Sequence, residues 1–140
     1  MLDTAYLKQL LELVGDKGYL GIDNGDLMNH LAPDEGQPVE FTEMGQQFKY
    51  HMDEAWMAGL IRDRDDVTAK DWGLVVGVSG HWAYRGKQLV LSPIGGELLE
   101  ELGKPKGLER LKQAVRSAGA AAGTEALRAG VAELLKGAIF

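Results

Sequence analysis

The chain has 140 residues, of which 45% are hydrophobic and 26% are charged, and its formal net charge is -6. This length and composition are typical of one globular domain with its own core. The sequence contains no cysteine, which excludes disulfides, cysteine-ligated zinc and thiolate catalysis.

A helix is predicted at the start of the chain. Asp3 or Thr4 can cap its N-terminus, and Gly15 and Gly18 can end it. Its apolar residues recur at helical spacing, namely Leu7, Leu10, Leu11 and Val14. We therefore expect this helix to place one face in the core.

Residues 19–31 predict a short strand and a short helix. The apolar stretch 19–22 favours the strand, and the polar cluster 23–25 favours a turn or helix cap. A short helix is expected at 26–31.

A longer helix is predicted after the polar loop 32–37. Thr42 can cap it, and it ends near residues 58–61. Its expected apolar face consists of Met44, Phe48, Met52, Ala55, Trp56 and Gly59. On this basis the ring of Trp56 is predicted to lie in the core.

A β-hairpin is predicted after residues 62–71, which are nearly all polar and are expected to form a solvated connection. Residues 72–79 and 82–91 are rich in aromatic and β-branched side chains, as strands are. Ser79-Gly80-His81 is a natural reversal between them.

The expected pairing of this hairpin is specific. We expect residues 73–78 to pair antiparallel with residues 86–91, and residues 79–85 to form the tip.

The last third of the chain predicts three helices. Ser92 and Pro93 start the first, which carries Leu98, Leu99 and Leu102 and stops at Gly103 and Pro105. The second continues to Gly119 and carries Leu108, Leu111 and Val115. Thr124 is expected to cap the third, whose apolar stripe consists of Leu127, Val131, Leu134 and Leu135.

Two segments resemble a winged helix-turn-helix domain, an α+β fold. The end of the long helix, Ala58-Gly59-Leu60-Ile61, resembles the end of a recognition helix. The segment 89–99, in which Ser92 and Gly95 take the places of the usual threonine and glycine, resembles a wing strand that runs into the next helix. The resemblance implies a winged-helix domain at residues 1–102 and a helical extension at 103–140 packed on it. A helix across residues 82–90 would contradict a winged-helix fold.

The chain is more narrowly similar to an uncharacterised winged-helix family that is common in phages and prophages. The similarity covers roughly residues 3–136 and rests on Tyr50-His51, on the basic turns at 104–112 and on the break at 119–123. It implies a protein that acts by binding.

Catalytic and metal sites are not predicted. His30, His51 and His81 lie far apart in the sequence without a paired ligand, so each is expected to be a surface or capping residue. The serines lack the pattern of a nucleophile elbow, and no glycine-rich loop precedes Lys-Ser or Lys-Thr. We therefore expect neither enzymatic activity nor a cofactor.

Two groups of side chains are the candidate partner-binding residues. On the exposed face of the recognition helix they are Gln46, Gln47, Lys49, Tyr50, Asp53, Glu54 and Met57. On the wing they are His81, Trp82, Tyr84, Arg85 and Lys87.

Charge placement favours a protein partner over DNA at these residues. Residues 1–71 hold 15 acids and 6 bases, whereas residues 72–140 hold 6 acids and 9 bases. Residues 34–54 carry six carboxylates and one lysine, Lys49, which would repel phosphates. We expect a binding protein that recognises a basic protein surface, for example to inhibit a host defence complex or to serve as an assembly adaptor.

The alternative function is a sequence-specific DNA-binding regulator, in which Gln47 and Lys49 would read base edges.

The apolar stripe on the last helix predicts a homodimer through the C-terminal helices. No signal peptide and no apolar run of about 20 residues is present, so a cytoplasmic protein without a membrane partner is expected, in the host cell if a phage encodes it.

Overall fold

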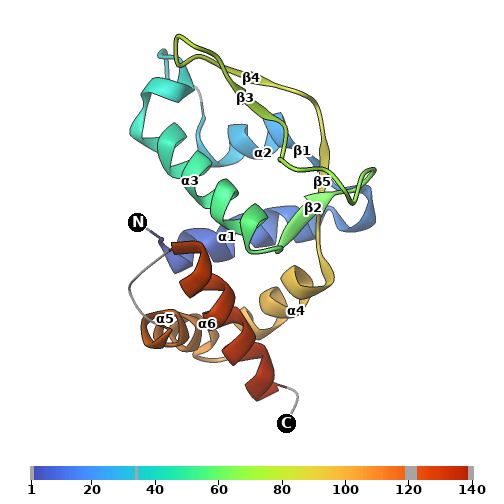
Figure 1. The fold of residues 1–140 in the computed structure, drawn as a ribbon, viewed down its shortest axis with the longest axis vertical. Coiled ribbons are helices and arrows are strands. Elements are labelled where there is room, and N and C mark those ends of the chain that lie inside the picture. The colour runs from blue at the N-terminus through green and yellow to red at the C-terminus, as the bar shows by residue number, and fades with distance from the viewer. Residues whose placement is uncertain (1, 34, 119–122, 139–140) are drawn as a thin grey trace.

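The computed structural model describes residues 2–33, 35–118 and 123–138 (Figure 1). The fold is α+β, as the sequence predicts. In chain order the elements are α1 (Thr4–Asp16), the 3-10 turn η1 (Gly18–Leu20), β1 (Ile22–Asp23), α2 (Asn24–Leu31), the 3-10 turn η2 (Val39–Phe41), α3 (Glu43–Met57), β2 (Ile61–Asp63), β3 (Leu74–Val76), β4 (Trp82–Tyr84), β5 (Gln88–Leu91), α4 (Pro93–Leu102), α5 (Gly107–Ser117) and α6 (Gly123–Ala138).

The strands form two separate antiparallel groups. The first is a three-stranded sheet in the order β1-β5-β2, and the second is the β3–β4 hairpin. Within the sheet, Ile22 and Asp63 flank Leu89 from the two sides. In the hairpin, Leu74 faces Tyr84 and Val76 faces Trp82.

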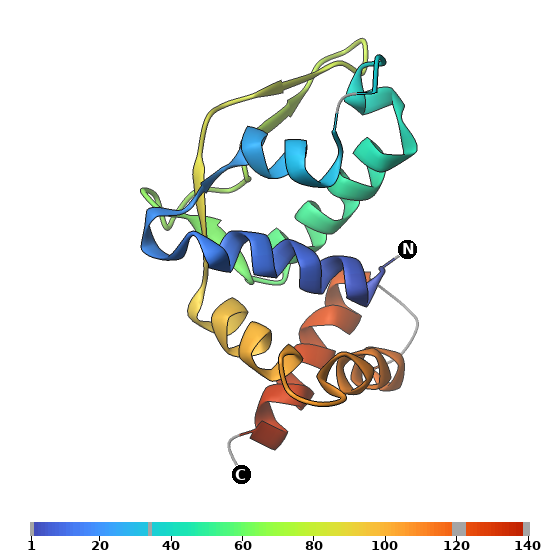
Figure 2. The same cartoon turned by 180° about the vertical axis from the view of Figure 1, so that it is seen from behind.

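Helix α1 crosses the middle of the molecule, with α2, α3 and the hairpin on one side and α4, α5 and α6 on the other (Figures 1 and 2). Both sides contribute to one hydrophobic core, which includes Leu7 and Leu11 of α1, Phe48 of α3, Leu111 of α5 and Leu127 of α6. The burial of apolar surface therefore holds the C-terminal helices and the N-terminal part together.

Side-chain caps start four helices where the sequence predicts caps. The carboxylates of Asp3 and Asp23 accept hydrogen bonds from the first backbone N–H groups of α1 and α2. The hydroxyls of Thr42 and Ser92 do the same for α3 and α4. Each cap satisfies donors that the helix itself leaves without a partner.

The predicted pairing of residues 73–78 with 86–91 is wrong. The hairpin is shorter, since β3 pairs with residues 82–84, and β5 instead enters the three-stranded sheet. The side-chain amide of Asn24, which is buried, donates to the backbone carbonyls of Trp72 and Arg85, at 2.9 Å each. These hydrogen bonds fix the chain where the second strand of the hairpin ends, which a local pattern could not predict.

Two shorter predictions also need correction. Residues 19–22 were expected to form a strand, but the positive φ of Gly18 starts η1, and only Ile22 continues into β1. Residues 62–71 were expected to be a solvated connection, but the first two belong to β2. Asp63 is buried there because its carboxylate lies 3.5 Å from Nζ of Lys87.

The tryptophan in the core is Trp72, which is 2% exposed. Its ring packs edge-on against Phe48, and its Nε1 donates to Oδ1 of Asp53 over 2.8 Å. Trp56, which the sequence placed in the core, is only half-buried and donates to the carbonyl of Lys70. Gly59 is exposed and lies beyond the end of α3.

The apolar stripe of the last helix is covered within the chain. Leu127, Val131 and Leu134 are buried, because α6 packs on α5, α4 and α3. The expected dimer surface on this stripe is therefore not exposed. Thr124 is not the cap of α6, since the helix begins at Gly123, and the break at 119–123 lies mostly outside the described residues.

Among the helices of the described ranges, none is long and apolar enough to cross a membrane.

Candidate functional site

The exposed side of α3 carries most of the predicted recognition-helix residues. Gln46, Gln47 and Met57 are exposed, and Lys49 and Tyr50 are half-buried. They protrude because the opposite side of the helix is buried. Phe48, Met52 and Ala55, which recur at helical spacing, lie on that buried side in the core. A shallow hollow of about 670 Å³ runs along this side.

The β3–β4 hairpin lies beside α3 (Figure 1), and a second hollow of about 330 Å³ separates them. Val76 of β3 and Met57 of α3 both line it. Lys49 and Asp53 line both hollows, so the two lie next to each other. We call the exposed side of α3 together with the hairpin the α3–hairpin face.

Valines give the hairpin an apolar surface. Val75 and Val76 are 43% and 51% exposed, and Val78 at the turn is fully exposed. Phe41 of η2, 56% exposed, lies edge-on to His81 beside the same turn.

Two cations of the α3–hairpin face form ion pairs within the chain. Nζ of Lys49 lies 2.7 Å from Oδ2 of Asp53, one helical turn away. The guanidinium of Arg85 lies 2.8 Å from Oδ2 of Asp71. Burial raises the pKa of Asp71, but the N–H of Gly73 and the charge of Arg85 outweigh it and hold that pKa below its ordinary value.

Glu40 joins η2 to the turn of the hairpin. Its carboxylate accepts a hydrogen bond from the backbone N–H of Trp82 over 3.0 Å and lies 3.2 Å from Nδ1 of His81. The hydrogen bond from Trp82 is the largest of the contacts that lower the pKa of Glu40. Glu40 is therefore an anion at neutral pH, and its carboxylate ties η2 to the turn through the N–H of Trp82 and the ring of His81.

Lys87 is also paired. It is half-buried, its Nζ lies 3.5 Å from a carboxylate oxygen of Asp63, and it donates to the carbonyl of Asp71 over 3.0 Å. It follows the hairpin and is not on the exposed side of it.

Three predicted contact residues make contacts within the chain. Glu54 is buried, and its Oε2 accepts a hydrogen bond from the hydroxyl of Thr124 over 2.8 Å. The half-buried hydroxyl of Tyr84 contacts the sulfur of Met28, and burial raises the pKa of Tyr84 to about 12. Asp53 is shared between Lys49 and Trp72.

The structure adds residues that the sequence did not single out. Val75, Val76 and Val78 had been treated only as strand or turn residues, and Phe41 had no assigned role. The exposure of the valines depends on which side of the hairpin faces the core. The expected pairing of residues 73–78 with 86–91 was wrong, so it could not indicate this exposure. Alternation along β3 would have indicated only Val75, because Val76 lies on the same side of the strand as the half-buried Leu74.

The histidines do not form a metal site. No cluster of three or more potential metal ligands occurs in residues 2–33, 35–118 and 123–138. Of the two positions expected for His51, surface or capping, the surface one is wrong because His51 is buried; its Nε2 accepts the N–H of Asp3 at the start of α1.

The basic segment after α4 is partly neutralised. Glu101 is buried, and its two carboxylate oxygens meet Lys104 at 2.6 Å and Arg110 at 3.2 Å. The hydrogen bond from Lys104, with the help of Arg110, lowers the pKa of Glu101. These cations tie α4 to α5.

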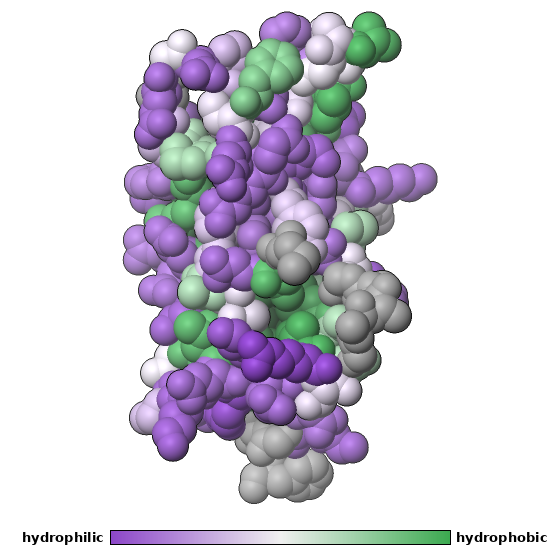
Figure 3. Space-filling model, turned by 90° about the vertical axis from the view of Figure 1, so that its left-hand side faces the viewer, coloured by the Kyte–Doolittle hydropathy of each residue, from purple (hydrophilic) through white to green (hydrophobic). Residues whose placement is uncertain are grey.

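The surface toward η2 and α5, seen in Figure 3, is mainly hydrophilic with separate hydrophobic patches.

No family model matches the chain, and comparisons with curated proteins and with solved structures give no significant match.

Proposed function

We propose that the chain is a non-catalytic winged-helix binding protein whose α3–hairpin face binds a protein partner. The order α1, β1, α2, α3, β2, hairpin and β5 supports the fold assignment, because a winged-helix domain has this order. In that assignment α3 is the recognition helix, the β3–β4 hairpin is the wing, and α5 and α6 are a C-terminal extension.

The observation that carries the choice of a protein partner is the pairing of cations on this face. Lys49 and Arg85 each form an ion pair with a carboxylate of the same chain, and the imidazole of His81 lies beside the carboxylate of Glu40. DNA binding gains its affinity from unpaired cations that replace counterions at phosphates. A face whose cations are matched by its own carboxylates, with Glu43 exposed beside them, gains little in this way.

The exposed valines support the same choice. Val76 and Val78 would be desolvated by an apolar surface of a protein, and the cores of protein interfaces are depleted in charge and rich in apolar contacts. The exposed carboxylate of Glu43 at the edge then favours a partner with basic groups around an apolar centre. A host complex or an assembly bound by a phage protein, as the sequence resemblance suggests, would be a partner of this kind.

A photocrosslinking experiment tests the proposal. A photoreactive phenylalanine is placed at position 76, at position 78 and, as a control, at the exposed Gln113 of α5. In a lysate of the source cells, we expect one protein to crosslink from positions 76 and 78 but not from position 113. With that protein purified, Val78→Asp should weaken binding at least about tenfold, or about 1.4 kcal/mol.

Val67→Asp is the matched control, because Val67 is a valine 72% exposed in the connection before β3. It should leave the affinity unchanged. Equal effects of Val67→Asp and Val78→Asp would contradict the proposal.

DNA binding is the second candidate function, and one observation favours it. Gln47 is exposed on α3, and glutamine can pair with adenine in the major groove. The test is a titration with a random pool of DNA duplexes at increasing salt. Binding below 1 µM that falls steeply between about 50 and 200 mM salt and is lost in Gln47→Ala, but not in Val78→Asp, would overturn the choice of a protein partner.

A further inference from the structure

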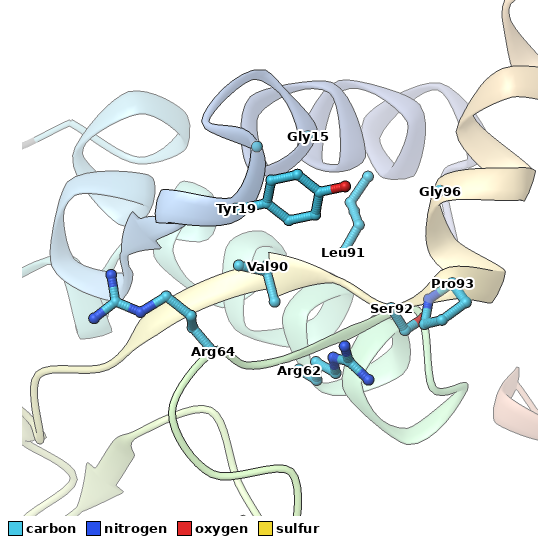
Figure 4. A pocket seen from close by; sticks show the side chains of 10 residues that line it. Gly15, Tyr19, Arg62, Arg64, Val90, Leu91, Ser92, Pro93 and Gly96 are labelled. Carbon is cyan, nitrogen blue, oxygen red and sulfur yellow. The ribbon is translucent and has the colours of Figure 1, made fainter.

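A third hollow lies away from the α3–hairpin face, beside β5. Its volume is about 570 Å³, and η1, β2 and the first turn of α4 surround it. Figure 4 shows the ring of Tyr19 over β5 near Leu91, with Arg62 and Arg64 on the other side of the strand and Pro93 at the end. We call this hollow the β5 groove.

Large apolar side chains are exposed around the β5 groove. Tyr19 is 98% exposed and Leu20 is 76% exposed, both on η1, and Ile94 in the first turn of α4 is 49% exposed. Val90 and Leu91 form the strand between them. Of the three exposed side chains, Tyr19 lines the groove itself, and exposed apolar surface beside a hollow is a feature of surfaces that bind partners.

There is free space in the groove for a side chain of a partner. Gly96 of α4 lines it, and a Cβ atom placed on Gly96 would meet no described atom within 4 Å. Gly15 on the opposite wall differs, because a Cβ there would lie 2.9 Å from the side chains of Leu91 and Leu99. The open part of the groove is therefore beside the first turn of α4.

The charge beside the groove is positive, although the chain as a whole is acidic. Arg62 is exposed and is the cross-strand neighbour of Val90. Among the described residues it forms no ion pair. Arg64 is held differently, by two hydrogen bonds to Asp65 and one to the carbonyl of Leu20. Arg62 therefore presents a guanidinium that is ready to take a carboxylate, often with two hydrogen bonds.

We propose that the β5 groove binds a short segment of a partner protein in which a large apolar side chain lies next to a carboxylate. The apolar side chain packs on Val90 and Pro93 beside Gly96, with Tyr19 against it. The carboxylate pairs with Arg62. This site is independent of the α3–hairpin face, so the chain could join two proteins.

The probe is the acetylated, amidated hexapeptide Gly-Asp-Phe-Asp-Leu-Gly, titrated into the full chain labelled with nitrogen-15. We expect saturable chemical-shift changes at the backbone amides of Tyr19, Arg62, Val90 and Gly96. A peptide with lysine in place of both aspartates, and one with alanine in place of phenylalanine and leucine, should each bind at least tenfold more weakly.

Three variants sharpen the test. Arg62→Glu, a change at an exposed position, should weaken binding of the acidic peptide at least tenfold and improve binding of the lysine peptide. Gly96→Leu should fill the open space and abolish binding. Val78→Asp, on the α3–hairpin face, should leave binding unchanged, so failure of this site and failure of the proposed function can be told apart.

Several results would overturn the proposal. These are the absence of saturable changes, equal binding of the acidic and lysine peptides, or undiminished binding by Gly96→Leu with a native spectrum. Changes confined to the α3–hairpin face would overturn it as well. Stronger binding to vesicles of anionic lipid than to the peptide, lost in Tyr19→Ala, would assign the groove to a membrane surface instead.

Discussion

The backbone N–H of Asp3 donates a hydrogen bond to Nε2 of His51 over 2.9 Å, which joins the start of α1 to the middle of α3. The other ring nitrogen, Nδ1, lies 2.8 Å from the carbonyl of Gln47 and donates to it. One nitrogen donates and the other accepts, so the imidazole must be neutral. Protonation would place a second hydrogen opposite the N–H of Asp3.

This contact predicts a loss of stability in mild acid. Burial is the main cause that lowers the pKa of His51 below its ordinary value of 6.5. The unfolded chain therefore binds a proton at a higher pH than the folded chain. The contribution of His51 to stability is fully present above about pH 6.5 and is lost as the pH falls through the lowered pKa.

Urea unfolding at pH 7.5 and pH 5.0 measures the effect. The free energy of unfolding of the wild type should fall more between these values than that of His51→Gln, which cannot gain the proton. His30 and His81 are present in both proteins, so the difference isolates His51. Equal falls would show that His51 does not titrate against folding.

Replacement of the two tryptophans should have unequal costs. Trp72→Ala removes a buried ring and its hydrogen bond to Asp53, so we expect a loss of about 3–5 kcal/mol in the free energy of unfolding. Trp56→Ala removes a half-buried ring and should cost about 1 kcal/mol. Denaturant unfolding measures both costs. An equal or greater cost for Trp56→Ala would contradict the burial of Trp72, rather than Trp56, in the core.

Gly95 and Gly96 are neighbours in α4 and provide a matched pair. A Cβ at position 95 would lie 1.9 Å from the carbonyl oxygen of Leu60, whereas a Cβ at position 96 meets no described atom within 4 Å. Gly95→Ala should therefore force α4 away from β2 and cost about 1–3 kcal/mol or more. Gly96→Ala should stabilise the protein by about 0.5–1 kcal/mol, because alanine favours a helix.

Thermal unfolding of the two variants gives the comparison. The expected result is a lower Tm for Gly95→Ala and an equal or higher Tm for Gly96→Ala than in the wild type. A tolerated Gly95→Ala would mean that α4 does not approach Leu60 so closely.

The hydrogen bond between Glu54 and Thr124 predicts energetic coupling between α3 and α6. Glu54 is buried, so loss of the hydroxyl leaves a carboxylate oxygen without its partner. A double-mutant cycle with Glu54→Ala and Thr124→Val should give a coupling of about 1.5–3 kcal/mol. Thr124→Ser keeps the hydroxyl and should retain most of the stability. Additive single effects would exclude the coupling.

Local signals predicted the helices well. Each cap at Asp3, Asp23, Thr42 and Ser92 involves backbone groups two or three residues away, so a sequence window contains all the partners. Thr124 shows the limit of this approach. It has the side chain of a cap, but its hydroxyl bonds to Glu54, 70 residues earlier in the chain.

The strand pairing and the candidate site depend on contacts that are distant in sequence. Residues 82–91 look like one strand in the sequence. In the structure the side-chain amide of Asn24 donates to the carbonyl of Arg85, and after that residue β5 pairs with β1 and β2. The predicted exposure is confirmed where helical spacing alone decides it, as for Gln46, Gln47 and Met57. It is wrong for Glu54, which is buried and bonds to Thr124 of α6, a contact distant in sequence.

The way in which the hairpin is anchored has a consequence for how such chains diversify. Asn24 holds the backbone at Trp72 and at Arg85, and within the described residues the hairpin pairs with no third strand. Insertions or replacements between Val76 and Trp82 would thus leave the register of the three-stranded sheet intact. Homologous chains should therefore differ in length first between these two residues. Replacement of the whole hairpin could change which partner is bound while the hydrophobic core stays the same.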